Sequence, residues 1–432
     1  MRRIKILKLV VYLFIFVLVF TFTGCSYKKT TEDIMGKEIS EEEKDTKANF
    51  QATEVSDLQT KNLHKLGRVW GYVKYSHPVF LLGEKDWDEE LLNLIPIVYN
   101  SESEEQVNNI LYKWFVELGE IDYKTSDIDT KWESATEKDK VVQADTNWIE
   151  DESYLGASLS DSLSQLKVIP EVNRRNAPVY FINLGMPMFK NEKSYEDMSY
   201  MDTDYRLLGL FRFWNAIEYY FPYLDIMDDD WNEQLLAFIP RMIKGTDKQS
   251  YELTLAEIGV YLHDAHVRFE DRDYLFNEFG KYTAPAKLTQ VNGELVIYYI
   301  GKEYRDSCQL NPGDILVKIN GKDINNVIDE VKKYCSYPTD EKILILAPLV
   351  LRSHNKTMEV TVLRNNEETV LSIEGVEDYN PRIDISTSHE LLENNIGLIN
   401  PSKLSYDEIP EIMDKFSSTN GIIVIYGSIL QI

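Results

Sequence analysis

Cysteine and basic side chains are both scarce in this sequence. It has 3 cysteines among 432 residues, which excludes a small domain built on a disulfide framework. Lys and Arg number 46 against 72 for Asp and Glu, giving a formal net charge of −26. This excess of negative charge excludes nucleic acid as a partner, because phosphates are bound by basic surfaces. We interpret the acidity as a source of solubility.

Histidine is rare as well, with 6 in the chain. Cys308 and Cys335 could form a disulfide in an oxidising compartment, but neither lies at a metal-binding spacing from a histidine. We therefore predict no metal and no cofactor. The apolar content of 44% is enough for extended hydrophobic cores, and the length predicts two or three domains.

The first 25 residues have the pattern of a secretion signal. Arg2 and Arg3 precede a short apolar run over 9–20, which is followed by Gly24 and Cys25. This ending resembles the lipobox of bacterial lipoproteins, and the resemblance implies cleavage before Cys25 and lipidation of its thiol. The alternative is an uncleaved anchor, which the shortness of the apolar run disfavours. We expect a lipid-anchored protein on the cell membrane, facing outside the cytoplasm.

A duplicated block dominates the remaining sequence. Residues 63–96 align without a gap with residues 207–240, and 13 of the 34 positions are identical. Average residue usage would give about two or three matches by chance. The matches include Trp70 with Trp214 and Trp87 with Trp231. The apolar residues in both copies recur at helical spacing, which predicts two helical repeats with aromatic cores.

Only the second copy ends in a polar cluster, Leu262-His263-Asp264-Ala265-His266. The first copy has no histidine there, so we infer that one repeat became a site and the other stayed structural. Two alternatives remain open: His266 could cap a helix end beside Asp264, or the two histidines with Asp264 could hold a metal. No second cluster of ligands accompanies them, which disfavours the metal.

The pattern changes to a period of two from about residue 287. Leu295–Ile300 reads as a buried strand, and Leu310-Asn311-Pro312-Gly313-Asp314-Ile315 supplies a turn and the start of the next strand. A tight Asn320-Gly321 turn, an amphipathic helix over 327–334 and two strands over 357–362 and 368–373 follow. This is the element order of a PDZ-like domain.

A strand over 396–400, a helix over 406–416 with Ser405 as its N-cap, and a strand over 421–426 close the chain. Strand, helix and strand in this order open a parallel α/β layer.

The sequence thus predicts a multi-domain α+β protein. Its predicted parts are a signal peptide over 1–25, a polar tether over 26–60, a first helical repeat over 61–122, a connecting α/β region over 123–206, a second helical repeat over 207–284, a PDZ-like domain over 285–380 and the start of an α/β catalytic core over 381–432.

The helical region with Asp-x-His, then Pro-Gly-Asp-Ile-Leu and Ile-Asn-Gly, then Ile-Gly-x-Ile with a helix and Gly-Ile-Ile resembles the C-terminal-processing (tail-specific) and tricorn-type serine peptidases. The resemblance covers roughly residues 200–425. It implies that His266 is the general base of a serine nucleophile, with Asp264 beside it. It also implies that the PDZ-like domain captures a peptide or protein substrate by adding a strand. The surface for this capture is expected at Leu310, Pro312, Gly313, Asp314 and Ile315.

The sequence departs from that family at its end. In the family the nucleophilic serine follows the strand that corresponds to 421–426, after an Asp-Leu-Arg-like segment. Here residues 425–432 take that place, and we expect Ser428 to be a bystander. We interpret the chain as a membrane-tethered endopeptidase that is incomplete and inactive. The alternative is a non-catalytic lipoprotein that binds extended peptides through the PDZ-like domain.

Overall fold

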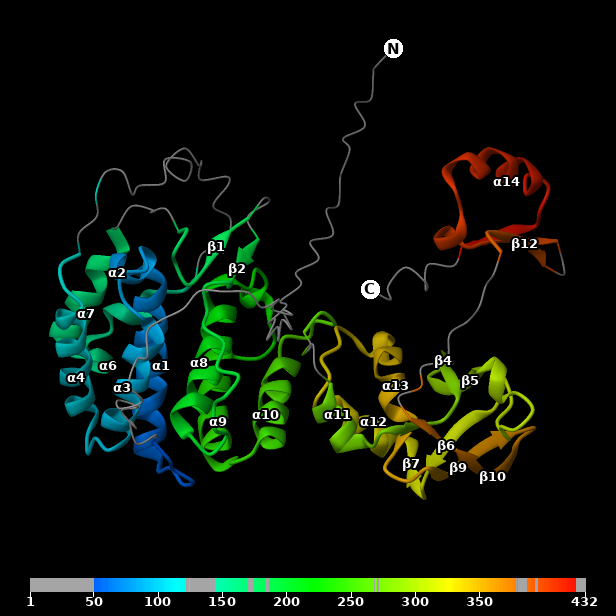
Figure 1. The fold of residues 1–432 in the computed structure, drawn as a ribbon, viewed down its shortest axis with the longest axis horizontal. Coiled ribbons are helices and arrows are strands. Elements are labelled where there is room, and N and C mark those ends of the chain that lie inside the picture. The colour runs from blue at the N-terminus through cyan, green and yellow to red at the C-terminus, as the bar shows by residue number, and fades with distance from the viewer. Residues whose placement is uncertain are drawn as a thin grey trace, which may run out of the picture. The chain divides into compact units, whose positions relative to one another are not determined.

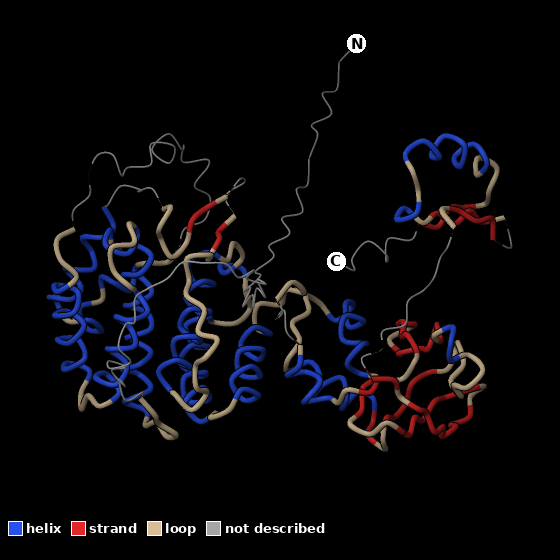
Figure 2. Tube along the Cα trace, viewed as in Figure 1, coloured by secondary structure: helices blue, strands red, loops and turns tan. Residues whose placement is uncertain are grey.

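The computed structural model describes residues 50–121, 124, 144–168, 174–182, 186–267, 269, 272–377, 379, 387–392 and 395–424. The chain divides into two compact units. The helical unit comprises the residues up to Phe279 together with Asn325–Leu346, and the β-rich unit comprises Gly280–Ile324 and the residues from Ala347 on. Figure 2 shows helices dominating the first unit and strands the second. The mixed α+β class predicted from the sequence is confirmed.

The predicted repeats appear as two sets of three helices, and the second and third helices of each set begin at equivalent positions. The first set is α1 (Asp57–Ser76), α3 (Trp87–Tyr99) and α4 (Glu104–Glu117), and the second is α8 (Thr203–Tyr220), α9 (Trp231–Lys244) and α10 (Lys248–Val260). Asp86 and Asp230 cap α3 and α9 in the same way, since each side chain accepts two backbone N–H groups. Inside each repeat a tryptophan of the first helix donates its indole N–H to the backbone of the second: Trp70 to Trp87 and Trp214 to Trp231, both at 2.7 Å.

The two repeats pack against each other through equivalent positions. α1 lies beside α8 (Figure 1), and Gly67 and Gly71 contact Phe211 and Asn215 respectively. One turn further along, the rings of Tyr75 and Tyr219 meet edge to face at 5.6 Å. Each of these pairs joins a position to its counterpart in the other repeat, which is the pattern of an internal two-fold relation.

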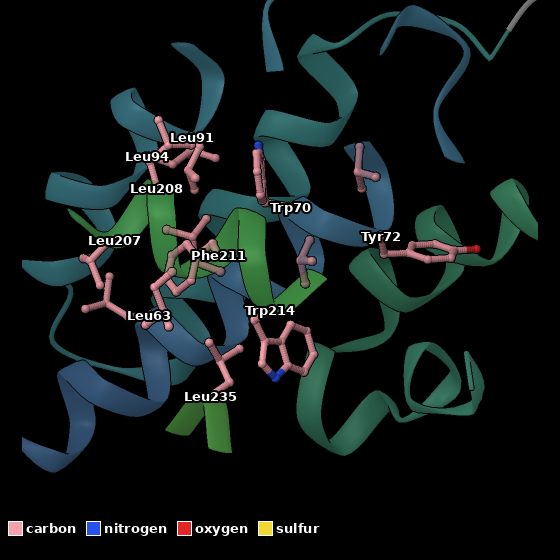
Figure 3. Packing of buried hydrophobic residues seen from close by; sticks show 14 of the residues in the cluster. Leu63, Trp70, Tyr72, Leu91, Leu94, Leu207, Leu208, Phe211, Trp214 and Leu235 are labelled. Carbon is pink, nitrogen blue, oxygen red and sulfur yellow. The ribbon is translucent and has the colours of Figure 1, made fainter. Parts of the chain in front are cut away.

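A single hydrophobic core serves both repeats. Figure 3 shows Leu63 and Trp70 of the first repeat in one cluster with Leu207, Phe211 and Trp214 of the second. Glycine at 67 and 71 allows this approach, because a Cβ atom at Gly71 would collide with the Asn215 side chain.

The connecting region contains both strands and helices. Its strands are short, β1 (Tyr180–Phe181) and β2 (Pro187–Met188), while α6 (Glu152–Leu155) and α7 (Ala157–Ser164) are helical. Leu155, Leu159 and Leu163 recur every four residues and are buried in the repeat core, a helical spacing that the polar composition of the region obscures. The other elements of this unit are α2 (Pro78–Leu81), α11 (Asp273–Phe279), α12 (Ile324–Lys332) and the 3₁₀ turns Asn147–Glu150, Gln165–Val168, Leu224–Ile226 and Asp340–Leu346.

The β-rich unit contains a sheet in the strand order β10-β9-β6-β5-β4, with β7 paired to β6. Three hairpins close through asparagine-containing turns with positive φ at both central residues: Asn292 with Gly293, Asn320 with Gly321, and Asn365 with Asn366. The bounds are β4 (Ala286–Val291), β5 (Glu294–Ile300), β6 (Ile315–Ile319), β7 (Lys322–Asp323), β9 (Thr357–Arg364) and β10 (Glu367–Glu374). A second sheet joins β11 (Val376–Glu377), β3 (Tyr282–Thr283) and β8 (Arg352–Ser353), and short helical pieces are Lys302–Tyr304 and α13 (Ala347–Val350).

The last described residues form a small three-stranded sheet. β13 (Ile396–Ile399) pairs in parallel with β14 (Gly421–Val424), as the strand–helix–strand pattern predicted, and β12 (His389–Leu392) pairs antiparallel on the other side. Between them lie the 3₁₀ turns Pro401–Lys403 and Tyr406–Glu408 and the helix α14 (Ile409–Lys415). Ser405 forms a capping box with Glu408 at the start of this helical segment, as predicted. Residues 425 and 426 of the predicted strand lie outside the described part.

Candidate functional site

Asp264 and His266 lie together in the turn that follows α10. The Asp264 carboxylate Oδ1 accepts the backbone N–H of His266 at 2.8 Å and lies 2.7 Å from the imidazole Nδ1. An ionised carboxylate only accepts hydrogen bonds, so Nδ1 is the protonated ring nitrogen. The His266 side chain is 46% exposed. The carboxylate therefore fixes one edge of the imidazole, and in the neutral ring Nε2 on the other edge is the acceptor.

A serine from far along the chain supports this turn. The Asp264 N–H donates to the Ser336 hydroxyl at 2.9 Å, and the hydroxyl lies 3.5 Å from the Val260 carbonyl. Ser336 is buried, and it belongs to the helical unit together with Asp264. Ser336 was missed in the sequence because its 72-residue separation from Asp264 leaves no periodic or motif signal.

The neighbouring histidine is arranged differently. His263 has a positive φ of 48°, and its Nε2 lies 3.5 Å from Asp229. Among the described residues no group of three or more His, Cys, Asp and Glu side chains could hold a metal. Cys308 and Cys335 are free thiols.

The residues expected to bind peptide lie at the start of β6, where their backbone is already paired. Gly313 N–H donates to the Ile297 carbonyl and Ile297 N–H donates to the Asp314 carbonyl, both at 2.8 Å. Strand addition at these two residues would therefore require β5 to leave. Leu310 is buried, Pro312 and Gly313 are exposed and Ile315 is half-buried.

Asp314 is a structural anchor of this turn. Its buried carboxylate accepts two hydrogen bonds from Arg364 of β9, each at 2.7 Å, and the backbone N–H of Asn311 at 2.7 Å. A bidentate arginine–carboxylate pair of this kind fixes the turn against the sheet.

A second cluster of charged side chains links α1, α3 and α8. Arg212 contacts both Asp88 and Glu192, Lys74 contacts Glu192 at 2.5 Å, and the Trp87 indole donates to Glu192 at 3.2 Å. Burial alone would raise the pKa of Glu192, but the charges of Lys74 and Arg212 hold it below its ordinary value. Every charge in this cluster is compensated, which suits a clamp between the repeats rather than a reactive group.

The described residues thus form an α+β protein in which a carboxylate orients one exposed imidazole. No family model matches the sequence, and no curated protein matches it. Among solved structures, mature CPAF is similar with a TM-score of 0.35 and 13% identity, over 51% of this chain and 55% of that one. Mature CPAF in complex with lactacystin gives a TM-score of 0.34 and 12% identity over 51% and 55%. The chain therefore spans about half the length of these structures.

The predicted signal peptide, the predicted lipidation site Cys25 and most of the predicted tether lie outside the described residues. Among the helices that the structure does describe, none is long and apolar enough to cross a membrane.

Proposed function

We propose that this chain is a serine-type endopeptidase of the tail-specific or tricorn-like kind, tethered to a membrane through a lipidated Cys25. The observation that carries the proposal is the Asp264–His266 pair. The carboxylate holds Nδ1 at 2.7 Å, and Nε2 is the ring nitrogen that a general base uses. An aspartate that fixes the tautomer and stabilises the imidazolium is the arrangement of serine hydrolases.

The chemistry follows from this geometry. His266 Nε2 takes the proton of a serine hydroxyl as its oxygen attacks the peptide carbonyl carbon. The imidazolium, stabilised by Asp264, then gives that proton to the leaving amine, and water releases the acyl group by the reverse transfer. No serine hydroxyl among the described residues is hydrogen-bonded to His266. The nucleophile is therefore proposed to come from a segment outside the described residues.

A serine-reactive fluorophosphonate tests the proposal. The chain is labelled alone and when extended through each forward reading frame that follows Ile432 in its coding DNA. We expect one of the extended forms to be labelled. In His266→Ala the rate of labelling should fall by roughly a thousandfold, since general-base catalysis contributes about 10²–10⁴-fold.

His263→Asn is the matched control for this experiment. His263 lies three residues away with its own acidic neighbour Asp229, and asparagine tolerates its positive φ. Labelling should persist in this variant. Equal labelling of His266→Ala and the parent protein would reject His266 as the base.

A non-catalytic role in peptide binding is the second candidate, and one observation favours it. β4 is an edge of the five-strand path and pairs only with β5 among the described strands. An extended peptide could add to that edge through backbone hydrogen bonds. If no extended form is labelled while the chain still binds extended peptides, this candidate replaces the enzyme.

A further inference from the structure

We infer that Ser336 is a positioning residue for His266 and acts through Asp264; this role in catalysis rests on the proposed function. The Ser336 hydroxyl accepts the Asp264 N–H at 2.9 Å. Asp264 in turn holds both the backbone and the ring of His266. Ser336 thus holds the backbone of the residue that carries the carboxylate, without touching the imidazole.

The turn needs such a support because it begins at the end of a helix. The last carbonyls of α10 have no partner within the helix, and the Val260 carbonyl is shared by the His263 N–H and the Ser336 hydroxyl. One hydroxyl therefore links a terminal carbonyl of α10 to the Asp264 N–H. His263 between them has a left-handed φ of 48°, a conformation that non-glycine residues keep only when their surroundings hold it.

Burial makes this support difficult to replace. The Ser336 residue is 6% exposed. Water therefore has little access to take over the hydrogen bond if the hydroxyl is removed. Loss of the hydroxyl would leave a half-buried N–H unpaired and release the Asp264 backbone.

The segment Asn325–Leu346 contributes to the candidate site through Ser336. This segment follows β7 of the β-rich unit in the chain but packs within the helical unit. Through Ser336 it supplies a hydrogen bond to the turn that carries the candidate base. The return of the chain to the helical unit would then support the candidate site as well as cover apolar surface.

Nitrogen NMR of the His266 ring tests the inference without any peptidase assay. In the full chain we expect the form protonated at Nδ1 to dominate. In Ser336→Ala the Asp264 turn loses its support and the Asp264–Nδ1 hydrogen bond weakens, so the ratio of the Nδ1–H form to the Nε2–H form should fall by up to about fivefold, the factor that corresponds to one hydrogen bond of average strength. Ser336→Thr keeps the hydroxyl and should restore the ratio.

Ser160→Ala is the matched control. Ser160 is also buried in the helical unit, and its hydroxyl donates to the Ile149 carbonyl at 2.6 Å. Its loss should lower thermal stability to a similar extent while leaving the His266 ratio unchanged. An unchanged ratio in folded Ser336→Ala, or an equal change in Ser160→Ala, would overturn the inference.

The two proposals fail separately. A changed tautomer ratio without any fluorophosphonate labelling would uphold Ser336 as the support of the turn and reject the peptidase. If labelling depends on His266 but the tautomer ratio does not change in Ser336→Ala, the peptidase is upheld and the role of Ser336 is rejected.

Discussion

Arg206 and Asn62 occupy equivalent positions in the two repeats and perform related tasks. The buried Arg206 guanidinium donates to the carbonyls of Met242 and Ile243 in the last turn of α9, at 2.9 and 3.0 Å. The shorter Asn62 reaches the Ser101 carbonyl just beyond α3, at 3.4 Å. A positive group at a helix C-terminus also interacts favourably with the helix dipole.

Replacing Arg206 by methionine should therefore be costly. Buried carbonyls would lose charged donors, and we expect the free energy of unfolding to fall by about 3 kcal/mol. Urea unfolding followed by circular dichroism measures the change. Asn62→Ala provides the comparison, with an expected loss of about 1 kcal/mol. An equal decrease in the free energy of unfolding in the two variants would show that the charge of Arg206 adds nothing to its hydrogen bonds.

Glu218 stands where Lys74 stands in the other repeat, and it makes the stability depend on pH. Burial raises the pKa of its carboxyl from 4.5 to about 7, opposed by Arg68 and supported by Asp145 and Asp230. The folded state thus binds the proton more tightly than the unfolded state does. Stability is lost as pH rises from 4.5 through 7.

Glu218→Gln should remove this loss. We expect it to raise the free energy of unfolding by up to about 3 kcal/mol at pH 8 and to change it little at pH 4. Unfolding curves across this pH range measure the effect, with Glu117→Gln at an exposed position of α4 as the control. A parent and a Glu218→Gln variant with the same pH slope would exclude Glu218 as the cause.

At the scale of elements, β14 is the least protected strand of its sheet. Ile422, Ile423 and Val424 are 39%, 47% and 40% exposed, and β14 pairs only with β13 among the described strands. β9 by contrast lies between β10 and β6. Edge position and poor burial both lower the free energy of local opening.

Hydrogen exchange should separate these two strands in the monomeric protein. We expect the amides of β14 to exchange at least about a hundredfold faster than those of β9. Mass spectrometry of exchanged peptides over 421–424 and 357–364 gives the comparison. Comparable protection in a confirmed monomer would show that β14 is held by contacts the described residues do not provide.

Elements with local signals could be predicted from the sequence. The helix starts at Trp87 and Trp231 follow capping aspartates, and Asn320-Gly321 closes a hairpin as such a pair should. The helix α7 was not located within the predicted α/β region, although Leu155, Leu159 and Leu163 are regularly spaced. The serines on its polar face make the segment resemble a polar loop, and its apolar stripe is too short to stand out.

Contacts between distant segments could not be predicted in the same way. The sequence indicated Asp264 and His266 as neighbours, but it gave no sign of Ser336 beneath them. Nor did it indicate that Glu192 inserts its carboxylate between Lys74 and Arg212. Such partners are selected by packing of the whole unit, and a single sequence carries no period or spacing that marks them.

At the scale of the whole molecule, the chain passes between its two units three times. It enters the β-rich unit at Gly280, returns for Asn325–Leu346 and leaves again at Ala347. A fragment that ends at Phe279 therefore lacks the residue that holds the Asp264 turn. The helical unit is complete only when the chain that follows the β-hairpin of β6 and β7 is present.

The contacts between equivalent positions also govern which halves can associate. Glycine at 67 and 71 meets phenylalanine and asparagine at 211 and 215. If two first repeats faced each other, glycine would meet glycine and leave a gap in the packing. If two second repeats faced each other, the phenylalanine and asparagine side chains at these positions would collide. At these positions, each repeat therefore packs well against the other repeat but not against a second copy of itself. Any exchange of halves between neighbouring molecules would therefore have to reproduce the same first-to-second pairing at these positions.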